Sequence, residues 1–265
     1  MLPAQRRLEM AQFIQKNGGA DTETLARQFG VSMITARRDL KILEEQNQLK
    51  TTWGGAVPLN FQPREIPYAN KATSELDAKK AIACLAADMV HDDTCILLDA
   101  GTTMLELAEL LRTRRITVIT TDLQIALLLV SSPSVTVHLA GGWVDPVSLA
   151  CNDENTCEFF NSLHVTQAFI GTSFWDVARG ASTSSTAKMH IKRRMMASAQ
   201  ESILLTDSSK YGKFSHWSAG RLHEFGCIVT DSGLPVAVRD EIAATGARLH
   251  IAEINGALFQ AGHAG

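Results

Sequence analysis

Residues 25–43 read Leu-Ala-Arg-Gln-Phe-Gly-Val-Ser-Met-Ile-Thr-Ala-Arg-Arg-Asp-Leu-Lys-Ile-Leu, and their pattern predicts the fold of the N-terminal part of the chain. A Gly-Val pair makes a short turn in this stretch, and Ser32 is placed to cap the helix that follows. In that helix Ala36, Leu40 and Leu43 recur at helical spacing and form a buried stripe. Because the opposite face carries basic and hydroxyl side chains, the stretch predicts a helix-turn-helix whose second helix enters the major groove of DNA.

The sequence on either side completes a winged helix-turn-helix domain. A helical pattern over residues 6–16 ends at a Gly-Gly pair, and a second helix follows with Asp21 or Thr22 as its cap. After the third helix, residues 50–56 have the short strand and the glycines of a wing. A basic helix face can also be merely solvated, but the cap, the stripe and the wing together favour DNA recognition. The predicted DNA-binding residues are Ser32, Thr35, Arg37, Arg38, Lys41, Thr51 and Trp53.

A proline-rich stretch divides the chain into parts of opposite charge. Three prolines from Pro58 to Pro67 predict an extended linker, because proline lacks a backbone donor and restricts the residue before it. The whole chain of 265 residues has a net charge of −3, which alone argues against a nucleic-acid partner. The part before the linker holds 8 Lys+Arg against 6 Asp+Glu, net +2, and the remainder holds 17 against 22, net −5. We expect a DNA-binding domain over 1–57, a linker over 58–74, an effector-sensing domain over 75–255 and a tail over 256–265.

The second domain is predicted to be α/β with a mostly parallel sheet. From about residue 79, short apolar runs typical of buried strands alternate with helical patterns. In such sheets ligands bind beyond the carboxyl ends of the strands. The predicted strands are residues 95–98, 116–120, 135–140, 168–170, 203–205, 228–230 and 248–254.

Small, hydroxyl-bearing and charged residues follow several of these strands. Glycines let backbone amides approach an oxyanion, and threonines at a helix start add donors beside the positive end of the helix dipole. Lys210 adds a positive charge, while Asp99 and Asp207 can accept hydrogen bonds from sugar hydroxyls. This chemistry suits a small phosphorylated polyol. The predicted effector-binding residues are Asp99, Gly101, Thr102, Thr103, Thr121, Asp122, Gly141, Gly142, Asp207 and Lys210.

Residues 25–43 resemble the DNA-binding signature of the DeoR family of bacterial transcriptional regulators, and residues 54–56 (Gly-Gly-Ala) match the end of that family's wing. Residues 99–103 (Asp-Ala-Gly-Thr-Thr), 141–142 (Gly-Gly) and 207–210 (Asp-Ser-Ser-Lys) stand at the places of its effector-sensing motifs. The resemblance implies a sensor fold similar to ribose-5-phosphate isomerase and the CoA transferases. It also implies a homodimeric or homotetrameric repressor of a carbohydrate or sugar-acid operon, released by a sugar phosphate or a related metabolite.

Two alternatives remain open on the sequence. One is a sugar-phosphate isomerase or transferase with an accessory DNA-binding head, because the aspartates and the lysine at the strand ends are groups that transfer protons. The other is a regulator with a degenerate pocket controlled by a protein partner, because Asp122, Asp153 and Phe174 replace residues usual in the family. Helical spacing places Lys188 and Lys192 on one face, which can line the pocket or face solvent.

Composition argues against several other classes of protein. The longest apolar run, residues 125–130, is far shorter than the ~20 residues that span a membrane. The five cysteines contain no Cys-x-x-Cys pair, which favours free thiols in the cytoplasm over a disulfide or zinc framework. We therefore expect a cytoplasmic protein with no cofactor, no metal and no catalytic residue. Its expected partners are operator DNA, a small-molecule effector and further copies of the chain.

Overall fold

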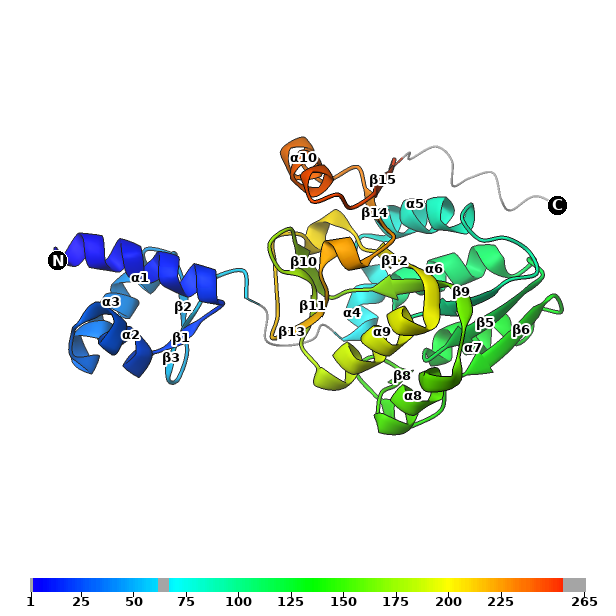
Figure 1. Ribbon diagram of the computed structural model, residues 1–265, viewed down its shortest axis with the longest axis horizontal. Coiled ribbons are helices and arrows are strands. Elements are labelled where there is room, and N and C mark those ends of the chain that lie inside the picture. Colours follow the sequence, from blue (N-terminus) through cyan, green and yellow to red (C-terminus); the bar gives the residue numbers. More distant parts are fainter. Residues whose placement is uncertain (1, 62–66, 255–265) are drawn as a thin grey trace. The chain divides into compact units, whose positions relative to one another are not determined.

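The computed structural model describes residues 2–61 and 67–254 and divides into two compact units, Met1–Phe61 and Gln62–Gly265 (Figure 1). The division falls inside the predicted linker. Residues 68–73 of that linker form instead a short helix of the second unit, α4 (Tyr68–Thr73). Linker residues 62–66 and the predicted tail, 256–265, lie outside the described residues.

The first unit is a winged helix-turn-helix, with three helices and a three-stranded antiparallel sheet in the order β1-β3-β2. The helices are α1 (Pro3–Asn17), α2 (Thr22–Phe29) and α3 (Met33–Glu45), and the strands are β1 (Ala20–Asp21), β2 (Lys50–Thr51) and β3 (Gly55–Val57). The carboxylate of Asp21 caps α2 by accepting the Thr24 N–H at 2.7 Å. The hydroxyl of Ser32 caps α3 by accepting the Thr35 N–H at 3.2 Å. Both caps use an oxygen placed just before the helix, as the sequence predicts.

A small apolar core holds these three helices together. Its buried members are Met10, Ile14, Leu25, Leu40, Leu43, Leu49 and Ala56. Beside it, the buried carboxylate of Asp39 on α3 pairs with Arg6 of α1 at 2.7 Å. Gly55 lets β3 lie against β1, because a Cβ at this position would meet the carbonyl oxygen of Ala20 at 2.1 Å. The inner face of α3 is thereby fixed, and its outer face is left to solvent.

A seven-stranded parallel sheet lies at the centre of the second unit, in the order β15-β14-β12-β9-β4-β5-β6 (Figure 1). The strands are β4 (Cys95–Leu98), β5 (Ile116–Thr120), β6 (Val135–Leu139), β9 (Val165–Gly171), β12 (Ala199–Leu205), β14 (Cys227–Asp231) and β15 (Leu249–Ala252). The main helices are α5 (Leu76–Ala87), α6 (Thr102–Leu111), α7 (Leu123–Leu129), α9 (Thr186–Ser198) and α10 (Val236–Ala244). Every neighbouring pair of strands is parallel, so the carboxyl ends of all seven lie at one edge of the sheet. The predicted α/β class is confirmed.

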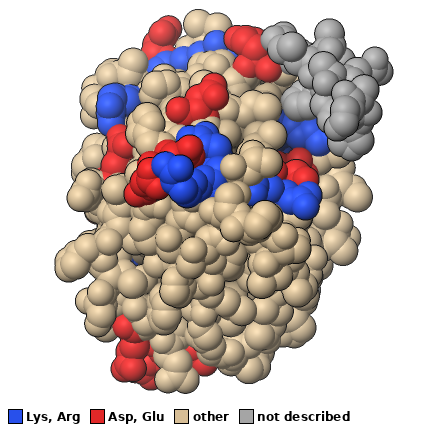
Figure 2. Space-filling view, turned by 90° about the vertical axis from the view of Figure 1, so that its right-hand side faces the viewer, with Lys and Arg blue, Asp and Glu red and all other residues tan. Residues whose placement is uncertain are grey.

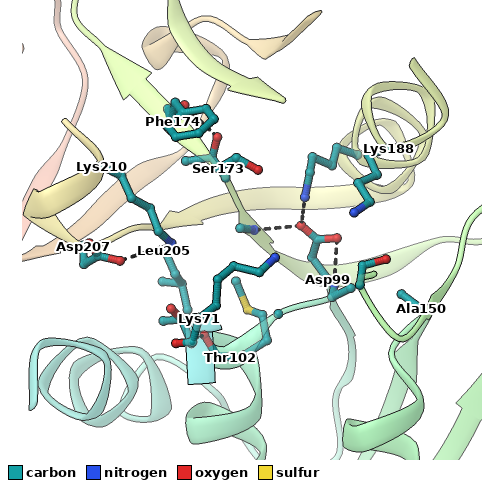
Figure 3. Close-up of a pocket in the computed structure, with 18 of the residues that line it drawn as sticks. Lys71, Asp99, Thr102, Ala150, Ser173, Phe174, Lys188, Leu205, Asp207 and Lys210 are labelled. Atoms are coloured by element: carbon teal, nitrogen blue, oxygen red, sulfur yellow. Dashed lines mark hydrogen bonds and ion pairs between the residues drawn. The ribbon is translucent and has the colours of Figure 1, made fainter. Parts of the chain in front are cut away.

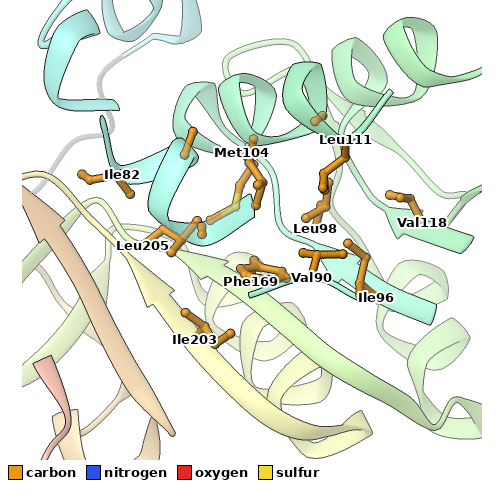
Figure 4. Close-up of a cluster of buried hydrophobic side chains, with 14 of the residues drawn as sticks. Ile82, Val90, Ile96, Leu98, Met104, Leu111, Val118, Phe169, Ile203 and Leu205 are labelled. Carbon is orange, nitrogen blue, oxygen red and sulfur yellow. The ribbon is translucent and has the colours of Figure 1, made fainter. Parts of the chain in front are cut away.

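Alternate residues of the central strands enter different hydrophobic clusters. Figure 4 shows Leu98 and Phe169 in one cluster, together with Leu111 of α6. Leu97 and Ile170, their neighbours in sequence, belong to the second cluster, which includes residues of α9 and α10. Because successive side chains of a strand point to opposite faces, the sheet is buried on both sides. This burial explains why its strands read as short continuous apolar runs.

Several smaller elements of the second unit have no clear signal in the sequence. They are α8 (Glu154–Phe159), an antiparallel sheet of β10 (Phe174–Asp176), β11 (Gly180–Thr183) and β13 (Trp217–Gly220), a hairpin of β7 (Val144–Asp145) and β8 (Ala150–Cys151), and helical turns at 160–162, 208–210 and 222–224. Each is too short to show a hydrophobic period. No helix in the described part of the chain has the length and apolar character that a membrane crossing requires.

Candidate functional site

The outer face of α3 presents a row of exposed side chains. Arg37, Arg38 and Lys41 are all exposed on this face. Ile34 lies beside them with 80% of its surface exposed, so little of it packs within the unit. The arginines can donate to guanine, and an exposed aliphatic side chain can contact a thymine methyl group. Ile34 is therefore a candidate DNA contact that joins the predicted set.

The other predicted DNA-binding residues mainly shape this surface. The hydroxyls of Ser32 and Thr35 lie 2.9 Å apart within the cap of α3. Thr51 donates its N–H and its hydroxyl to the Glu44 carboxylate at 2.8 and 2.5 Å, which ties the wing to α3. Both hydrogen bonds lower the pKa of Glu44, and the bond from the Thr51 hydroxyl has the larger effect. Trp53, in the turn between β2 and β3, is fully exposed. The candidate direct contacts are thus the exposed residues of α3 and the tip of the wing.

A cavity of about 140 Å³ lies beside the carboxyl ends of the parallel strands (Figure 3). Since a cavity needs only about 10–15 Å³ of such space to hold one water, this space fits a small metabolite. Most of the predicted effector-binding residues line it, namely Asp99, Gly101, Thr102, Thr103, Thr121, Asp207 and Lys210. Lys188 and Lys192 line it as well, so the pocket interpretation of these two lysines is confirmed.

Asp99 is the fixed centre of one side of the cavity. It follows β4 directly, and its carboxylate accepts the Ala100 N–H at 2.8 Å and the Gly171 N–H at 2.9 Å. The same carboxylate forms a buried ion pair with Lys192 of α9. A buried carboxylate needs such partners, because desolvation of an unpaired charge is costly. Asp99 therefore joins β4, β9 and α9 around the cavity.

Asp207 and Lys210 form a second ion pair in the cavity wall, with 3.1 Å between the carboxylate oxygen and Nζ. Ser209 donates its hydroxyl to the same carboxylate at 2.5 Å. Burial raises the pKa of Asp207, but the charge of Lys210 and the hydrogen bonds from Ser209 and Lys210 outweigh this effect, and the net pKa is lowered. Asp207 is therefore ionised at neutral pH.

Three predicted effector-binding residues do not line the cavity: Asp122, Gly141 and Gly142. Asp122 is fully buried and caps α7 by accepting the N–H groups of Gln124 and Ile125 at 2.8 and 3.2 Å. It also accepts the Gly101 N–H at 2.9 Å. Burial raises the pKa of Asp122 to about 6, although these three hydrogen bonds oppose the rise. Asp122 thus holds the loop that contains Gly101 and does not itself face the cavity.

The neighbouring Asp153 is also a helix cap. It accepts the Thr156 N–H at the start of α8 at 2.9 Å and the Trp143 N–H at 2.7 Å. Gly142 has φ +141°, and a Cβ there would lie 2.3 Å from Oδ1 of Asp153. The lack of a Cβ at Gly142 therefore leaves room for the Asp153 carboxylate, which holds the loop of Gly142 and Trp143 in place. Asp122 and Asp153 add no charge to the cavity wall, whereas Phe174 does line it.

Three lysines that the sequence-based prediction misses, Lys71, Lys79 and Lys213, complete the cavity. Six lysines line it against the two aspartates: Lys71, Lys79, Lys188, Lys192, Lys210 and Lys213. Lys71 rises from α4 into the cavity in Figure 3, and Lys79 comes from α5. Burial is the main cause that lowers the pKa of Lys79, and the nearby charge of Lys210 adds to it. The sequence gives little sign of Lys71 and Lys79, because neither α4 nor α5 follows a strand of the parallel sheet.

Comparison with known proteins gives consistent results for both units. A family model for a DeoR-like helix-turn-helix domain matches residues 6–61, and one for a DeoR C terminal sensor domain matches residues 74–232. The chain is similar to the uncharacterized HTH-type transcriptional regulator YgbI of Escherichia coli, with 35% identity over 89% of this chain and 92% of the relative. It is 34% identical to the transcriptional repressor AccR of Agrobacterium fabrum, over 79% of this chain and 82% of the relative. Among solved structures, ribose 5-phosphate isomerase A of Methanocaldococcus jannaschii aligns with a TM-score of 0.40 and 18% identity, covering 53% of this chain and 56% of the other.

Proposed function

The chain belongs to the DeoR family of HTH-type transcriptional regulators, and from this premise we propose that it is a repressor whose sensor cavity binds a small phosphorylated sugar or a related sugar acid. The observation that carries the proposal is the excess of six lysines over two aspartates in the cavity wall. Lysine binds phosphate as a point charge, and the amides and threonines at the start of α6 supply further donors. Repression is the activity that the name of the relative AccR describes.

The geometry favours binding over catalysis in this cavity. A general base works best when its pKa lies near the operating pH. The pKa of Asp207 is lowered by Lys210 and Ser209 despite burial, and Asp99 is committed to Lys192 and two backbone N–H groups. Neither carboxylate is therefore poised to take a proton from a sugar carbon. We propose that the cavity senses a ligand without transforming it.

The cavity assignment is tested by thermal unfolding of the full chain with a panel of sugar phosphates, the matching free sugars and sugar acids. A ligand at 100 times its Kd adds ~2.7 kcal/mol, which corresponds to an increase in Tm of about 5–10 °C. We expect such an increase with a phosphorylated sugar and little with its free sugar. The substitution Lys210→Met should abolish it, whereas Lys80→Met, outside the cavity wall, should retain it. If no compound shifts the wild-type Tm, control by a protein partner replaces the metabolite proposal.

We further propose that two copies associate through the face formed by β6 and α7. Residues 116–144 contain no Lys, Arg or Glu and a single Asp, which is the buried Asp122. Figure 2 shows a broad area without charged side chains on the side where Figure 1 places β6. β6 is an edge strand, and exposed apolar side chains of α7 lie in the same charge-free segment. The same face of a second copy is equally free of charged side chains, so the two faces can meet without burying a charge. Antiparallel pairing of the two β6 strands would also provide hydrogen-bond partners for the unpaired backbone groups at both sheet edges.

The association face is tested by placing a charge on it. Leu127 of α7 and Val130, the residue that follows this helix, are 67% and 70% exposed, so glutamate at either position fits the monomer but would be desolvated in the interface. We expect Leu127→Glu or Val130→Glu to shift the protein toward monomer in sedimentation velocity. The matched control is Val236→Glu on α10, where the wild-type side chain is 67% exposed and lies outside this face. Unchanged sedimentation of both the Leu127 and the Val130 variant would place the interface elsewhere.

A further inference from the structure

Helix α4 is the first described element of the sensor unit, and it forms part of the cavity wall. It begins at Tyr68, immediately after the segment that joins the two units. Lys71 extends from α4 into the cavity (Figure 3). A ligand in this cavity therefore lies against the part of the sensor that is nearest in sequence to the DNA-binding unit.

Two cavity residues hold α4 by the same carbonyl group. The ammonium of Lys79 donates to the carbonyl oxygen of Lys71, and the hydroxyl of Thr102 donates to that oxygen at 3.5 Å. Lys79 also donates to the carbonyl oxygen of Ser74 at 2.5 Å. Lys79 is only 2% exposed. A single buried ammonium thus links both ends of the turn from α4 into α5.

That turn has an unfavourable backbone conformation. Glu75 is the one residue between Ser74 and the first residue of α5, and it has φ +51° and ψ +39°. The left-handed region costs free energy for a residue with a Cβ, and such residues persist where surrounding contacts impose them. The two carbonyl bonds of Lys79 are contacts of this kind. Loss of them would let the turn relax.

The amino end of α4 has a further tie to the cavity. The N–H of Tyr68 donates to the carbonyl oxygen of Val147, in the hairpin of β7 and β8, at 3.0 Å. Asp145 of the same hairpin pairs with the cavity lysine Lys188, with 3.4 Å between the charged atoms. Contacts at both ends of α4 therefore lead to residues that a ligand would touch.

We propose that α4 transmits ligand occupancy to the DNA-binding unit, and that Lys79 is the positioning residue of this switch. The proposal rests on the proposed function, since it requires an anionic ligand in the cavity. An anionic group near Lys79 attracts its ammonium away from the carbonyl oxygens of Lys71 and Ser74. The strained turn at Glu75 then relaxes, α4 shifts, and paired DNA-binding units no longer hold the spacing that the operator requires.

The charge around Lys79 favours this competition. Within residues 67–254 no carboxylate lies at ion-pair distance from its ammonium, whose partners are two neutral carbonyl groups. A carbonyl offers the ammonium only a dipole, whereas an anionic oxygen adds the Coulomb attraction of a full negative charge, which is strong in a site shielded from water. A phosphate or carboxylate of the ligand can therefore outcompete the carbonyls. The buried pair of Asp99 and Lys192 does not have this freedom, because both of its charges are already matched.

The test uses the full chain without ligand and the DNA duplex that the wild-type protein selects from a random pool. The substitution Lys79→Met removes both carbonyl bonds and should mimic the ligand-bound state. We expect hydrogen exchange of residues 68–75 to become at least about tenfold faster, and operator affinity to fall by about 5- to 150-fold, the range typical of allosteric coupling. The matched control Lys80→Met, on the same helix, should change neither quantity.

A rescue variant separates this switch from simple loss of stability. Glycine adopts the left-handed region without the Cβ penalty, so Glu75→Gly stabilises the turn without Lys79. Measured as log Kd for the operator, the double variant Lys79→Met with Glu75→Gly should recover at least half of the loss that Lys79→Met alone causes. Faster exchange in Lys79→Met with wild-type operator affinity would overturn the coupling, as would failure of the glycine rescue in a folded double variant. Failure of the proposed function has a different signature, because the wild-type chain would then select no DNA or would show no response to any anionic ligand.

Discussion

Replacing Arg37 by alanine is expected to weaken operator binding by about 1–3 kcal/mol for each DNA-binding unit that engages the operator. Arg37 is exposed on the outer face of α3, while Ala36 and Leu40 hold the inner face in the core. The variant lacks the guanidinium group that can donate two hydrogen bonds to guanine, and the core of the unit keeps all of its side chains. The affinity is measured by fluorescence anisotropy at one fixed salt concentration, because phosphate contacts make it salt-dependent.

The matched control for this prediction is Arg27→Ala. Arg27 is an exposed arginine of the same unit, but it lies on α2 and pairs with Glu23 at 3.0 Å on the surface. It carries the same charge, so its removal shows the general electrostatic effect. Wild-type affinity in the Arg37 variant, or an equal loss in both variants, would show that Arg37 does not read a base.

The free energy of unfolding of the wild-type protein is expected to change by about 3 kcal/mol with pH because of Asp122, and replacing Asp122 by asparagine should remove this change. Burial raises the pKa of Asp122 from 3.8 to about 6 in the folded protein, at about 1.4 kcal/mol per pKa unit. Because the folded pKa is raised, the stabilising contribution is complete below pH 3.8 and is lost as the pH rises through about 6. The wild-type protein should therefore lose stability relative to Asp122→Asn across this range.

The measurement is urea unfolding of both proteins at a series of pH values from 3.5 to 7.5, chosen to bracket the two pKa values. Comparison of the two proteins cancels the other carboxylates, including Asp207, whose lowered pKa acts in the opposite direction. A constant difference in unfolding free energy over the whole range would show that Asp122 does not titrate as its burial requires.

Local signals in the sequence were sufficient to predict much of the fold. Ser32 caps α3 where a hydroxyl precedes a helical stripe, and the predicted strand over residues 116–120 matches β5 residue for residue. Each of these elements is defined by side chains close in sequence, through capping or through a continuous apolar run. The position of the cavity was predictable for a related reason, because parallel strands bring residues such as Asp99 and Asp207 to one edge of the sheet.

The lining of the cavity was harder to predict, because it depends on tertiary contacts. Lys71 lies in a stretch whose prolines indicate a linker, but in the structure it belongs to α4, which packs against α6. Asp122 follows a strand as a ligand-binding residue would, yet its carboxylate turns toward the N–H groups of α7 and of Gly101. A strand-end position shows that a residue is near the site. It does not show which way the side chain points.

The central claim is that occupancy of the sensor cavity controls DNA binding. The most direct test is the affinity of the full chain for its selected operator, with and without the phosphorylated sugar that gives the largest increase in Tm. We predict that the saturating compound weakens operator binding at least about fivefold, the lower end of typical allosteric coupling, in the wild-type protein but not in Lys210→Met. An operator affinity that is the same with and without a compound shown to bind the cavity would contradict the account.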